Sequence, residues 1–232
     1  MSSIPLLHIK NVSNTYTDRR FGPFGKIDLK PVLKNVNLEV KKGEIFGLTG
    51  KSGCGKTTLA RCILGLIDYD GEIFLNGEKY SKTSCEIQIV FQDPGASLNP
   101  VKKIGWLMEE PLNIHKIGTV QERKQLVDEM LLCVGLDPSY KTRRTHELSG
   151  GQKQRICIGR ALILKPRLLI ADEAISSLDV SAGAQILNLF MELHKNLNLD
   201  ILFISHNKNA VEYLCDRIAV MKKGIIDYIS DN

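Results

Sequence analysis

The sequence predicts an α/β fold in which a mainly parallel β-sheet is covered by helices. Helix-like and strand-like segments alternate along the second half of the chain, which is typical of this class. Residues 168–171 and 201–204 are short apolar runs of the kind that form fully buried strands. A glycine-rich segment, residues 50–55, also lies between an apolar run and a helix-like stretch. With 232 residues, 43% of them hydrophobic, the chain can bury a core without disulfides.

The N-terminal part of the chain predicts strands joined by turns. Residues 6–16 and 32–40 alternate between apolar and polar side chains and are expected to be strands. Residues 17–30 contain glycine and proline and are expected to form a loop. Residues 44–49 form a short apolar run before the glycine-rich segment, and residues 71–77 predict a further strand that ends in a turn.

The middle of the chain predicts a small helical subdomain, at about residues 93–147, inserted into one domain that spans residues 1–232. Its apolar residues recur at helical spacing. These residues are Trp106, Leu107, Leu112, Leu126, Val127, Met130, Leu131 and Val134. Further helices are expected at residues 150–164 and 182–196, the second with Ser181 as its N-cap.

Composition narrows the class of protein. The net charge is +5, from 31 basic and 26 acidic residues that are scattered along the chain. This mild excess could favour nucleic acid, anionic lipid or nucleotide phosphates, but an ordinary solvated surface is the simpler interpretation, and no nucleic-acid partner is expected. The six cysteines show no Cys-x-x-Cys pair and no zinc-ligand spacing, as in a reducing compartment. The N-terminus lacks a signal-peptide pattern, and no apolar stretch reaches membrane-spanning length. We therefore expect any link to a membrane to come through a partner.

Residues 50–57, Gly-Lys-Ser-Gly-Cys-Gly-Lys-Thr, fit the phosphate-loop pattern G-x-x-x-x-G-K-[ST]. A strand-like run precedes them and a helix-like stretch follows, so a glycine-rich turn that matches by chance is disfavoured, and a P-loop NTPase core is predicted. Lys56 is expected to reach the β- and γ-phosphates of ATP, and the Thr57 hydroxyl to bind Mg²⁺. The predicted ATP-binding residues of this segment are Gly50, Lys51, Ser52, Gly53, Cys54, Gly55, Lys56, Thr57 and Thr58.

Two consecutive carboxylates, Asp172 and Glu173, follow the apolar run 168–171. A buried parallel strand that ends in Asp can position a carboxylate beside a phosphate loop. Asp172 is expected to hold Mg²⁺, and Glu173 to act as the general base that polarises the attacking water. Without the phosphate loop, this pair would be interpreted as an ordinary solvated strand end.

Residues 148–152, Leu-Ser-Gly-Gly-Gln, are identical to the signature of the ABC family, and they lie upstream of Asp172 as in that family. The chain thus resembles an ABC nucleotide-binding domain, which implies an N-terminal antiparallel β subdomain beside the parallel sheet. Ser149, Gly150 and Gly151 open a helix and so form a second anion site. By resemblance, Leu148, Ser149, Gly150, Gly151 and Gln152 serve the γ-phosphate of ATP bound to another subunit.

The same resemblance implies roles for four further residues. Gln92 matches the loop that contacts Mg²⁺ and the attacking water, and His206 matches the switch histidine that holds the γ-phosphate. Asp179 matches the loop that crosses the dimer interface, and Tyr16 matches the aromatic residue that stacks on adenine. The implied catalytic residues are Glu173, His206, Gln92 and Lys56, and the implied Mg²⁺ ligands are Thr57, Gln92 and Asp172.

Residues 91–100, 182–190 and 201–206 are similar to the ATPases of the peptide/nickel importers. This implies import of peptides or metal chelates at the cytoplasmic face of a membrane. The implied partners are a second ATPase subunit, identical or not, transmembrane permease subunits and, indirectly, a substrate-binding protein. The sequence departs from the family at Ala174, usually Pro, and at Asn207, usually Asp. The chain also ends soon after residue 228, where relatives often continue.

Other classes remain as alternatives. ABC ATPases that act on nucleic acid insert long coiled coils between the phosphate loop and the signature, and that gap is short here. A nucleotide or small-molecule kinase would not need residues 148–152. A nucleotide-binding scaffold without turnover would be expected to lose Lys56, Glu173 or His206, and all three are present. An ATPase of another ABC transporter type remains possible, since transport specificity does not lie in the motor.

Overall fold

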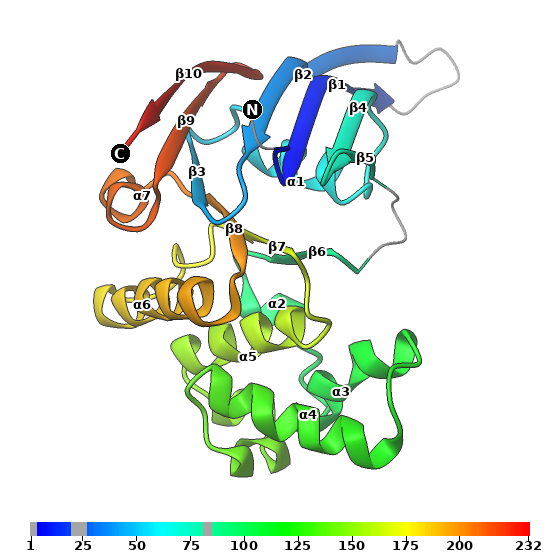
Figure 1. Ribbon diagram of the computed structural model, residues 1–232, viewed down its shortest axis with the longest axis vertical. Coiled ribbons are helices and arrows are strands. Elements are labelled where there is room, and N and C mark those ends of the chain that lie inside the picture. Colours follow the sequence, from blue (N-terminus) through cyan, green and yellow to red (C-terminus); the bar gives the residue numbers. More distant parts are fainter. Residues whose placement is uncertain (1–3, 20–26, 81–84) are drawn as a thin grey trace. The chain divides into compact units, whose positions relative to one another are not determined.

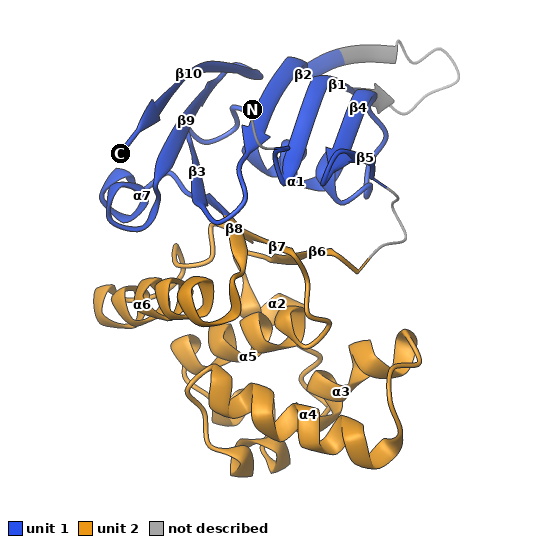
Figure 2. Ribbon diagram, in the orientation of Figure 1, with its two compact units in different colours: residues 1–84, 202–232 blue, residues 85–201 orange. Residues whose placement is uncertain are grey.

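The structure is a computed structural model that describes residues 4–19, 27–80 and 85–232. Figure 2 shows the chain divided into two compact units. Unit 1 comprises residues 1–84 and 202–232, and unit 2 comprises residues 85–201. Both units are built from strands and helices, in agreement with the predicted α/β class. Unit 2 is larger than the helical insertion expected at residues 93–147.

An antiparallel sheet forms one part of unit 1, with the strand order β2-β1-β4-β5 (Figure 1). Its strands are β1 (Leu7–Arg19), β2 (Ile27–Val40), β4 (Asp70–Leu75) and β5 (Glu78–Lys79). The loop expected at residues 17–30 is shorter in the structure, because β1 and β2 stay paired out to Arg19 and Ile27. The strand propensity of single residues depends on context, so pairing with the neighbouring strand determines where each strand ends. Residues 20–26 of that loop lie outside the described residues.

A second group of strands in unit 1 carries the glycine-rich segment. Strand β3 (Ile45–Thr49) is buried along its whole length and pairs in parallel with β9 (Arg217–Lys222), which pairs antiparallel with β10 (Ile225–Asp231). Helices α1 (Lys56–Ile63) and α7 (Lys208–Leu214) complete the unit. At Gly47 a Cβ would meet the Val211 side chain at 2.8 Å, so α7 packs directly on β3. Helix α7 and strand β10 were not predicted from the sequence.

Gly224, in the turn between β9 and β10, joins three segments of unit 1. Its N–H donates to the carbonyl of Cys54 at 2.9 Å, and its own carbonyl accepts from the N–H of Lys34 at 2.9 Å. Its φ is 84°, a left-handed conformation, and a Cβ here would lie 2.1 Å from the carbonyl oxygen of Val32. Only glycine fits both constraints. The turn thereby fixes the glycine-rich segment to β2 and to the β9–β10 hairpin.

Unit 2 combines two parallel strands with most of the helices (Figure 1). Strands β6 (Ile87–Val90) and β7 (Leu168–Asp172) pair in parallel, so their carboxyl ends lie side by side. Strand β8 (Asp200–Ile204) contains the boundary between the units. The helices are α2 (Pro94–Ser97), α3 (Ile104–Ile114), α4 (Val120–Cys133), α5 (Gly150–Leu162) and α6 (Val180–Leu197), with the 3₁₀ helices η1 (Pro138–Thr142) and η2 (Thr145–Glu147). Between residues 94 and 147 the regular elements are all helices, separated by loops, which agrees with the helical segment expected at about residues 93–147.

Helix α6 begins earlier than predicted. The expected N-cap, Ser181, lies inside the helix, and Asp179 is the cap: its carboxylate accepts from the N–H of Ala182 at 2.9 Å. Asp and Ser are both favourable N-cap residues. Asp179 has the extended backbone conformation of an N-cap, whereas Ser181 already lies within the helix. Ala182, the expected first residue of the helix, therefore lies in its first turn.

Within the described part of the chain, no helix combines the length and the apolar character needed to cross a lipid bilayer. The same residues contain no group of three or more His, Cys, Asp or Glu side chains that could hold a metal ion by themselves.

Replacing Gly224 with Ala should lower the free energy of unfolding through both backbone strain and steric overlap. The overlap with the Val32 carbonyl should add about 1–3 kcal/mol to the cost of a left-handed L-residue, which is about 1–2 kcal/mol. Urea unfolding of the purified protein measures this. Gly43→Ala is the control, because Gly43 has φ 73° but no atom within 4 Å of its Cβ position. Equal losses for the two variants would contradict a role for the Val32 contact.

Candidate functional site

The glycine-rich segment folds as a loop that connects β3 to α1. Gly53 and Gly55 have φ values of 76° and 115°, which glycine adopts without strain. Gly55 is the N-cap of α1, and no side chain caps that helix. The first-turn N–H groups of a helix have no partner within the helix, and they favour an anion. The predicted phosphate cradle therefore has the backbone conformation that its chemistry requires.

Lys56, the first residue of α1, lies against this loop. It is 6% exposed, and its ammonium donates to the carbonyl of Gly50 at 2.8 Å and to that of Lys51 at 3.4 Å. A buried lysine is costly unless its charge is solvated by hydrogen-bond acceptors, and the loop carbonyls provide them. These bonds hold the side chain of Lys56 against the loop, where a bound phosphate group would meet it.

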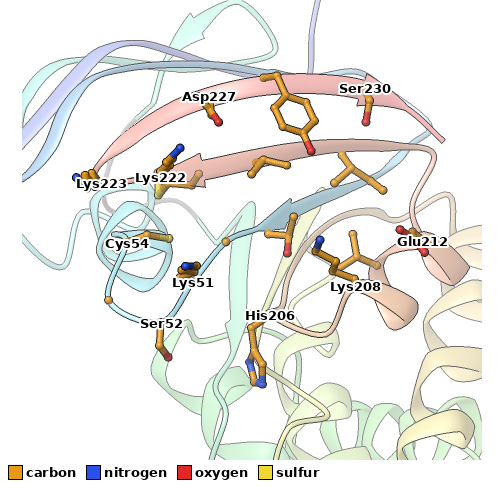
Figure 3. Close-up of a pocket in the computed structure, with 18 residues that line it drawn as sticks. Lys51, Ser52, Cys54, His206, Lys208, Glu212, Lys222, Lys223, Asp227 and Ser230 are labelled. Atoms are coloured by element: carbon orange, nitrogen blue, oxygen red, sulfur yellow. The ribbon is translucent and has the colours of Figure 1, made fainter.

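A cavity of about 680 Å³ in unit 1 brings part of the predicted cradle together with His206 (Figure 3). Residues 49–54 line it from the β3–α1 loop, and His206 lines it from the segment between β8 and α7. Helix α7 supplies Lys208, Val211 and Glu212. Although His206 is far from the cradle in sequence, the fold places both at one cavity, as the sequence predicts.

The charged residues that line this cavity are mainly cationic. They are Lys51, Lys208, Lys222 and Lys223 against Glu212 and Asp227. In Figure 3, Lys222 and Lys223 lie at the β9–β10 end, near Cys54. An excess of positive charge at a concave surface raises the local concentration of anions. The cavity therefore suits phosphate-bearing ligands.

Some residues predicted to bind nucleotide do not line this cavity. Tyr16 lies on β1 opposite Lys30 of β2 and is 40% exposed, and the aromatic residue at the cavity is Tyr228. Gly55, Lys56 and Thr57 are also absent from its lining. The adenine-stacking role of Tyr16 therefore stays a prediction.

The two predicted carboxylates lie at the carboxyl end of β7 in unit 2. Asp172 is the last residue of the strand and is 3% exposed. Glu173 follows with φ 53°, a left-handed conformation that is uncommon for a residue with a side chain. Its carbonyl accepts from the N–H of Ser176 at 3.1 Å and from the hydroxyl of Ser176 at 2.9 Å, which holds this turn. Backbone strain maintained in this way is common at functional positions.

The predicted Gln92 lies beside this turn. Val90 of β6 pairs with Ala171 of β7, so the segments that follow both strands emerge at the same edge. The Ser177 hydroxyl donates to the backbone carbonyl of Gln92 at 3.1 Å. The side chain of Gln92 is exposed. The structure thereby brings Gln92 to the edge of the sheet where Asp172 and Glu173 lie.

The predicted signature opens α5 with a reciprocal cap. The Ser149 hydroxyl accepts from the N–H of Gln152 at 3.3 Å, and the Gln152 side-chain carbonyl accepts from the N–H of Ser149 at 3.0 Å. This is a capping box, which satisfies two backbone donors and fixes the helix start. Gly150 and Gly151 follow, and a Cβ added to them would lie 3.4 Å from Leu178 and 3.3 Å from Ala182, respectively.

A second cavity, of about 420 Å³, lies in unit 2 at this helix start. Ser149, Gly151 and Gln152 line it together with Asp179, which was predicted to lie at a dimer interface. The lining also includes Tyr140 and Arg155, which the sequence analysis did not select. Neither residue belongs to a recognisable sequence motif, so their position beside the signature can be seen only in the folded structure.

Comparison with known proteins now identifies the family. The family model described as ABC transporter matches residues 33–176, more than half of the chain. The chain belongs to the ABC transporter ATP-binding family. The identification from residues 148–152 and the predicted fold class are both confirmed.

Two relatives of this ABC chain carry names that state a substrate class. It is 47% identical to the oligopeptide transport ATP-binding protein AppF of Bacillus subtilis, over 85% of this chain and 63% of AppF. It is 44% identical to the oligopeptide transport ATP-binding protein OppF of Streptococcus pyogenes serotype M1, over 86% of this chain and 68% of OppF. The chain thus spans about two thirds of the length of these relatives.

A solved structure supports the fold of this ABC chain. The ATP-binding cassette MJ0796, described as a dimeric post-hydrolysis state bound to ADP and Pi, matches with a TM-score of 0.81 and 28% identity. The match covers 97% of this chain and 98% of MJ0796. Ala174 and Asn207, which differ from the residues usual in the family, both fit their positions in the fold. Ala174 is buried, and Asn207 caps α7 by accepting from the N–H of Ala210 at 3.2 Å.

Alkylation of Cys54 should block ATP binding, because this side chain lies inside the cradle, 8% exposed, and any added group must occupy the loop. Fluorescent ATP binding after treatment with N-ethylmaleimide, with mass spectrometry to locate the adduct, measures the effect. Burial raises the pKa of Cys157 and that of Cys215 to about 12, so these thiols stay protonated and unreactive near neutral pH. ATP should protect Cys54, and undiminished binding after complete modification would refute the prediction.

Proposed function

We propose that this chain binds and hydrolyses ATP and that the hydrolysis energises import of peptides through membrane-embedded partners. The observation that carries the chemistry is the strained Glu173, held in a left-handed turn directly after the buried Asp172. A general base needs a fixed position relative to the water that it activates, and a rigid turn at a strand end provides one.

The residues present suit the nucleotide and its metal. The uncapped start of α1, the ammonium of Lys56 and the cationic cavity beside it favour a triphosphate. Thr57, Gln92 and Asp172 offer oxygen ligands, which are the donors that Mg²⁺ prefers. When bound, Mg²⁺ neutralises charge on the phosphate oxygens.

Each residue then has a role in the proposed reaction. The backbone N–H groups of the cradle and the Lys56 ammonium bind the phosphates and stabilise charge on the transferred phosphoryl group. Glu173 accepts a proton from the attacking water, and His206 holds the γ-phosphate and orients Glu173. Gln92 orients the same water. Tyr16 is proposed to stack on adenine, although it does not line the cavity in unit 1.

We propose that the signature acts in trans. Ser149, Gly150 and Gly151 at the start of α5 close over the γ-phosphate of ATP held by a second ATPase subunit, with Asp179 at the interface. The 420 Å³ cavity supports the proposal that the signature acts in trans, because the start of α5 and Asp179 line the same cavity of unit 2. Closure would exclude bulk water from the reaction.

Peptides are the favoured substrate class. The relatives AppF and OppF are named for oligopeptide transport, and the chain matches each over more than four fifths of its own length. Nickel or metal chelates are the second class implied by the resemblance. Permease subunits at the cytoplasmic face of the membrane are the proposed partners, with an extracytoplasmic binding protein acting indirectly.

Glu173→Gln should abolish ATP turnover and leave ATP binding intact. The amide keeps the size of the side chain but cannot accept the proton, so the rate should fall by at least about 100-fold. Phosphate release and equilibrium binding of fluorescent ATP measure the two effects. Glu192→Gln, on the exposed side of α6, is the control and should keep full turnover. A Glu173→Gln protein with the normal rate would refute the assignment of the base.

Peptide uptake by cells tests the substrate class. Cells that carry Lys56→Ala in place of the native chain should lose uptake of a labelled oligopeptide, because the variant removes the ammonium that binds the phosphates. Uptake of free amino acids should be unchanged. Uptake of ⁶³Ni in the same cells decides between the two classes, since loss of nickel uptake with normal peptide uptake would contradict the peptide proposal.

A further inference from the structure

We propose that Tyr140 is a positioning residue of the signature: its hydroxyl fixes the side chain of Gln152 and, through it, the Ser149 hydroxyl. This inference rests on the proposed function, because it concerns how the signature is held ready to meet nucleotide. Tyr140 lies in η1, outside residues 148–152, and no motif in the sequence marks it.

The amide of Gln152 is held at both ends. Its carbonyl oxygen accepts from the backbone N–H of Ser149 at 3.0 Å, and its NH₂ group donates to the Tyr140 hydroxyl at 3.0 Å. An amide with only the first bond could rotate about its side chain. Because the second bond needs the NH₂ group on the η1 side, it sets the orientation that presents the carbonyl to Ser149.

That orientation determines what the Ser149 hydroxyl can do. The hydroxyl oxygen accepts from the backbone N–H of Gln152 at 3.3 Å, which leaves its hydrogen to donate elsewhere. A donor next to the N–H groups that start a helix suits a phosphate oxygen. Loosening Gln152 would loosen both halves of the cap, and the hydroxyl would lose its fixed direction.

Tyr140 is itself held rigidly. The guanidinium of Arg143 stacks on its ring, with the central carbon 3.8 Å from the ring centroid. Its N–H donates to the carbonyl of Asp137 at 3.0 Å, and its carbonyl accepts from the N–H of Arg143 at 3.0 Å. The Asp137 carboxylate caps η1 by accepting from the N–H of Ser139 at 2.8 Å. Hydrogen bonds from Ser139 lower the pKa of Asp137, so this cap stays charged near neutral pH.

The 3₁₀ helix η1 is in turn tied to the neighbouring helices. The Lys141 ammonium contacts both carboxylate oxygens of Asp128 on α4, at 2.6 and 2.8 Å. On α3, a Cβ at Gly105 would come within 3.0 Å of Lys141, so the two backbones lie close together. A hydroxyl on such a fixed element positions its partner better than one on a free loop.

The location of Tyr140 also argues for a role beyond core packing. Its side chain is only half-buried, and it lines the 420 Å³ cavity together with Ser149, Gln152 and Asp179. An aromatic residue that served only to fill the core would not line an open polar surface next to the signature.

The test uses Tyr140→Phe, which removes the hydroxyl but keeps the ring and its contact with Arg143. In a Glu173→Gln background, ATP-dependent dimerisation should weaken by about 2- to 10-fold per site, the value of one ordinary hydrogen bond. Binding of ATP by the monomer should not change, because the cradle lies in unit 1. Loss of this hydrogen bond should lower the thermal unfolding midpoint only slightly, by about as much as the Thr142→Val control described below, so a defect in dimerisation that is confined to Tyr140→Phe reports the position of Gln152 and not overall stability.

Two controls isolate the proposed contact. Thr142→Val removes a hydroxyl from the same 3₁₀ helix, where it donates only to the carbonyl of Ser139, and dimerisation should keep its wild-type strength. In a Gln152→Ala background, Tyr140→Phe should have no further effect, since the hydroxyl acts through Gln152.

The outcomes separate this inference from the function on which it rests. A wild-type chain, assembled with its permease and ATPase partners, that turns over no ATP overturns the proposed function and this inference together. Normal wild-type turnover with Tyr140→Phe dimerising like the parent overturns this inference alone. Additive effects of Tyr140→Phe and Gln152→Ala also overturn it.

Discussion

An α-helix leaves the N–H groups of its first turn without partners inside the helix, and this chain uses two such helix starts. Helix α1 begins at Gly55 with no side-chain cap, directly after a loop of glycines. Helix α5 begins at Ser149, where the cap involves only the side chains of Ser149 and Gln152. Both starts combine glycine with main-chain N–H groups that have no acceptor within the helix, which is how a protein can bind phosphate without covering it with bulky side chains. The nucleotide chemistry proposed for this family member depends on these two anion sites, one in each unit.

Strain and burial shape a further group of residues in unit 2. Asp172 is almost fully buried at the end of β7, and Glu173 takes a left-handed conformation that its neighbour Ser176 stabilises. The Gln92 carbonyl is bonded by the Ser177 hydroxyl, so the two segments that leave β6 and β7 are fastened to each other. The segments that carry Gln92, Asp172 and Glu173 are therefore held together at one edge of the sheet.

The sequence predicted those parts of the site that are formed by consecutive residues. The cradle, the buried strand before Asp172 and the signature are contiguous runs, in which residue type alone constrains the backbone. Contacts between distant segments could not be predicted this way. Tyr140 meets Gln152 only because η1 is fixed to α3 and α4, and the cavity in unit 1 receives residues from the unpredicted β10. The cap of α6 was misplaced from Asp179 to Ser181 because several good cap residues follow one another and only the backbone conformation chooses.

Gly224 shows how the phosphate loop can be firm while its side chains stay small. Main-chain hydrogen bonds fasten the loop to the β9–β10 turn, from the N–H of Gly224 to the carbonyl of Cys54, and they link Gly224 onward to the N–H of Lys34. Such fastening takes up no side-chain volume. The loop can therefore consist largely of small residues, and the hairpin that holds its shape also supplies Lys222 and Lys223 to the lining of the neighbouring cavity.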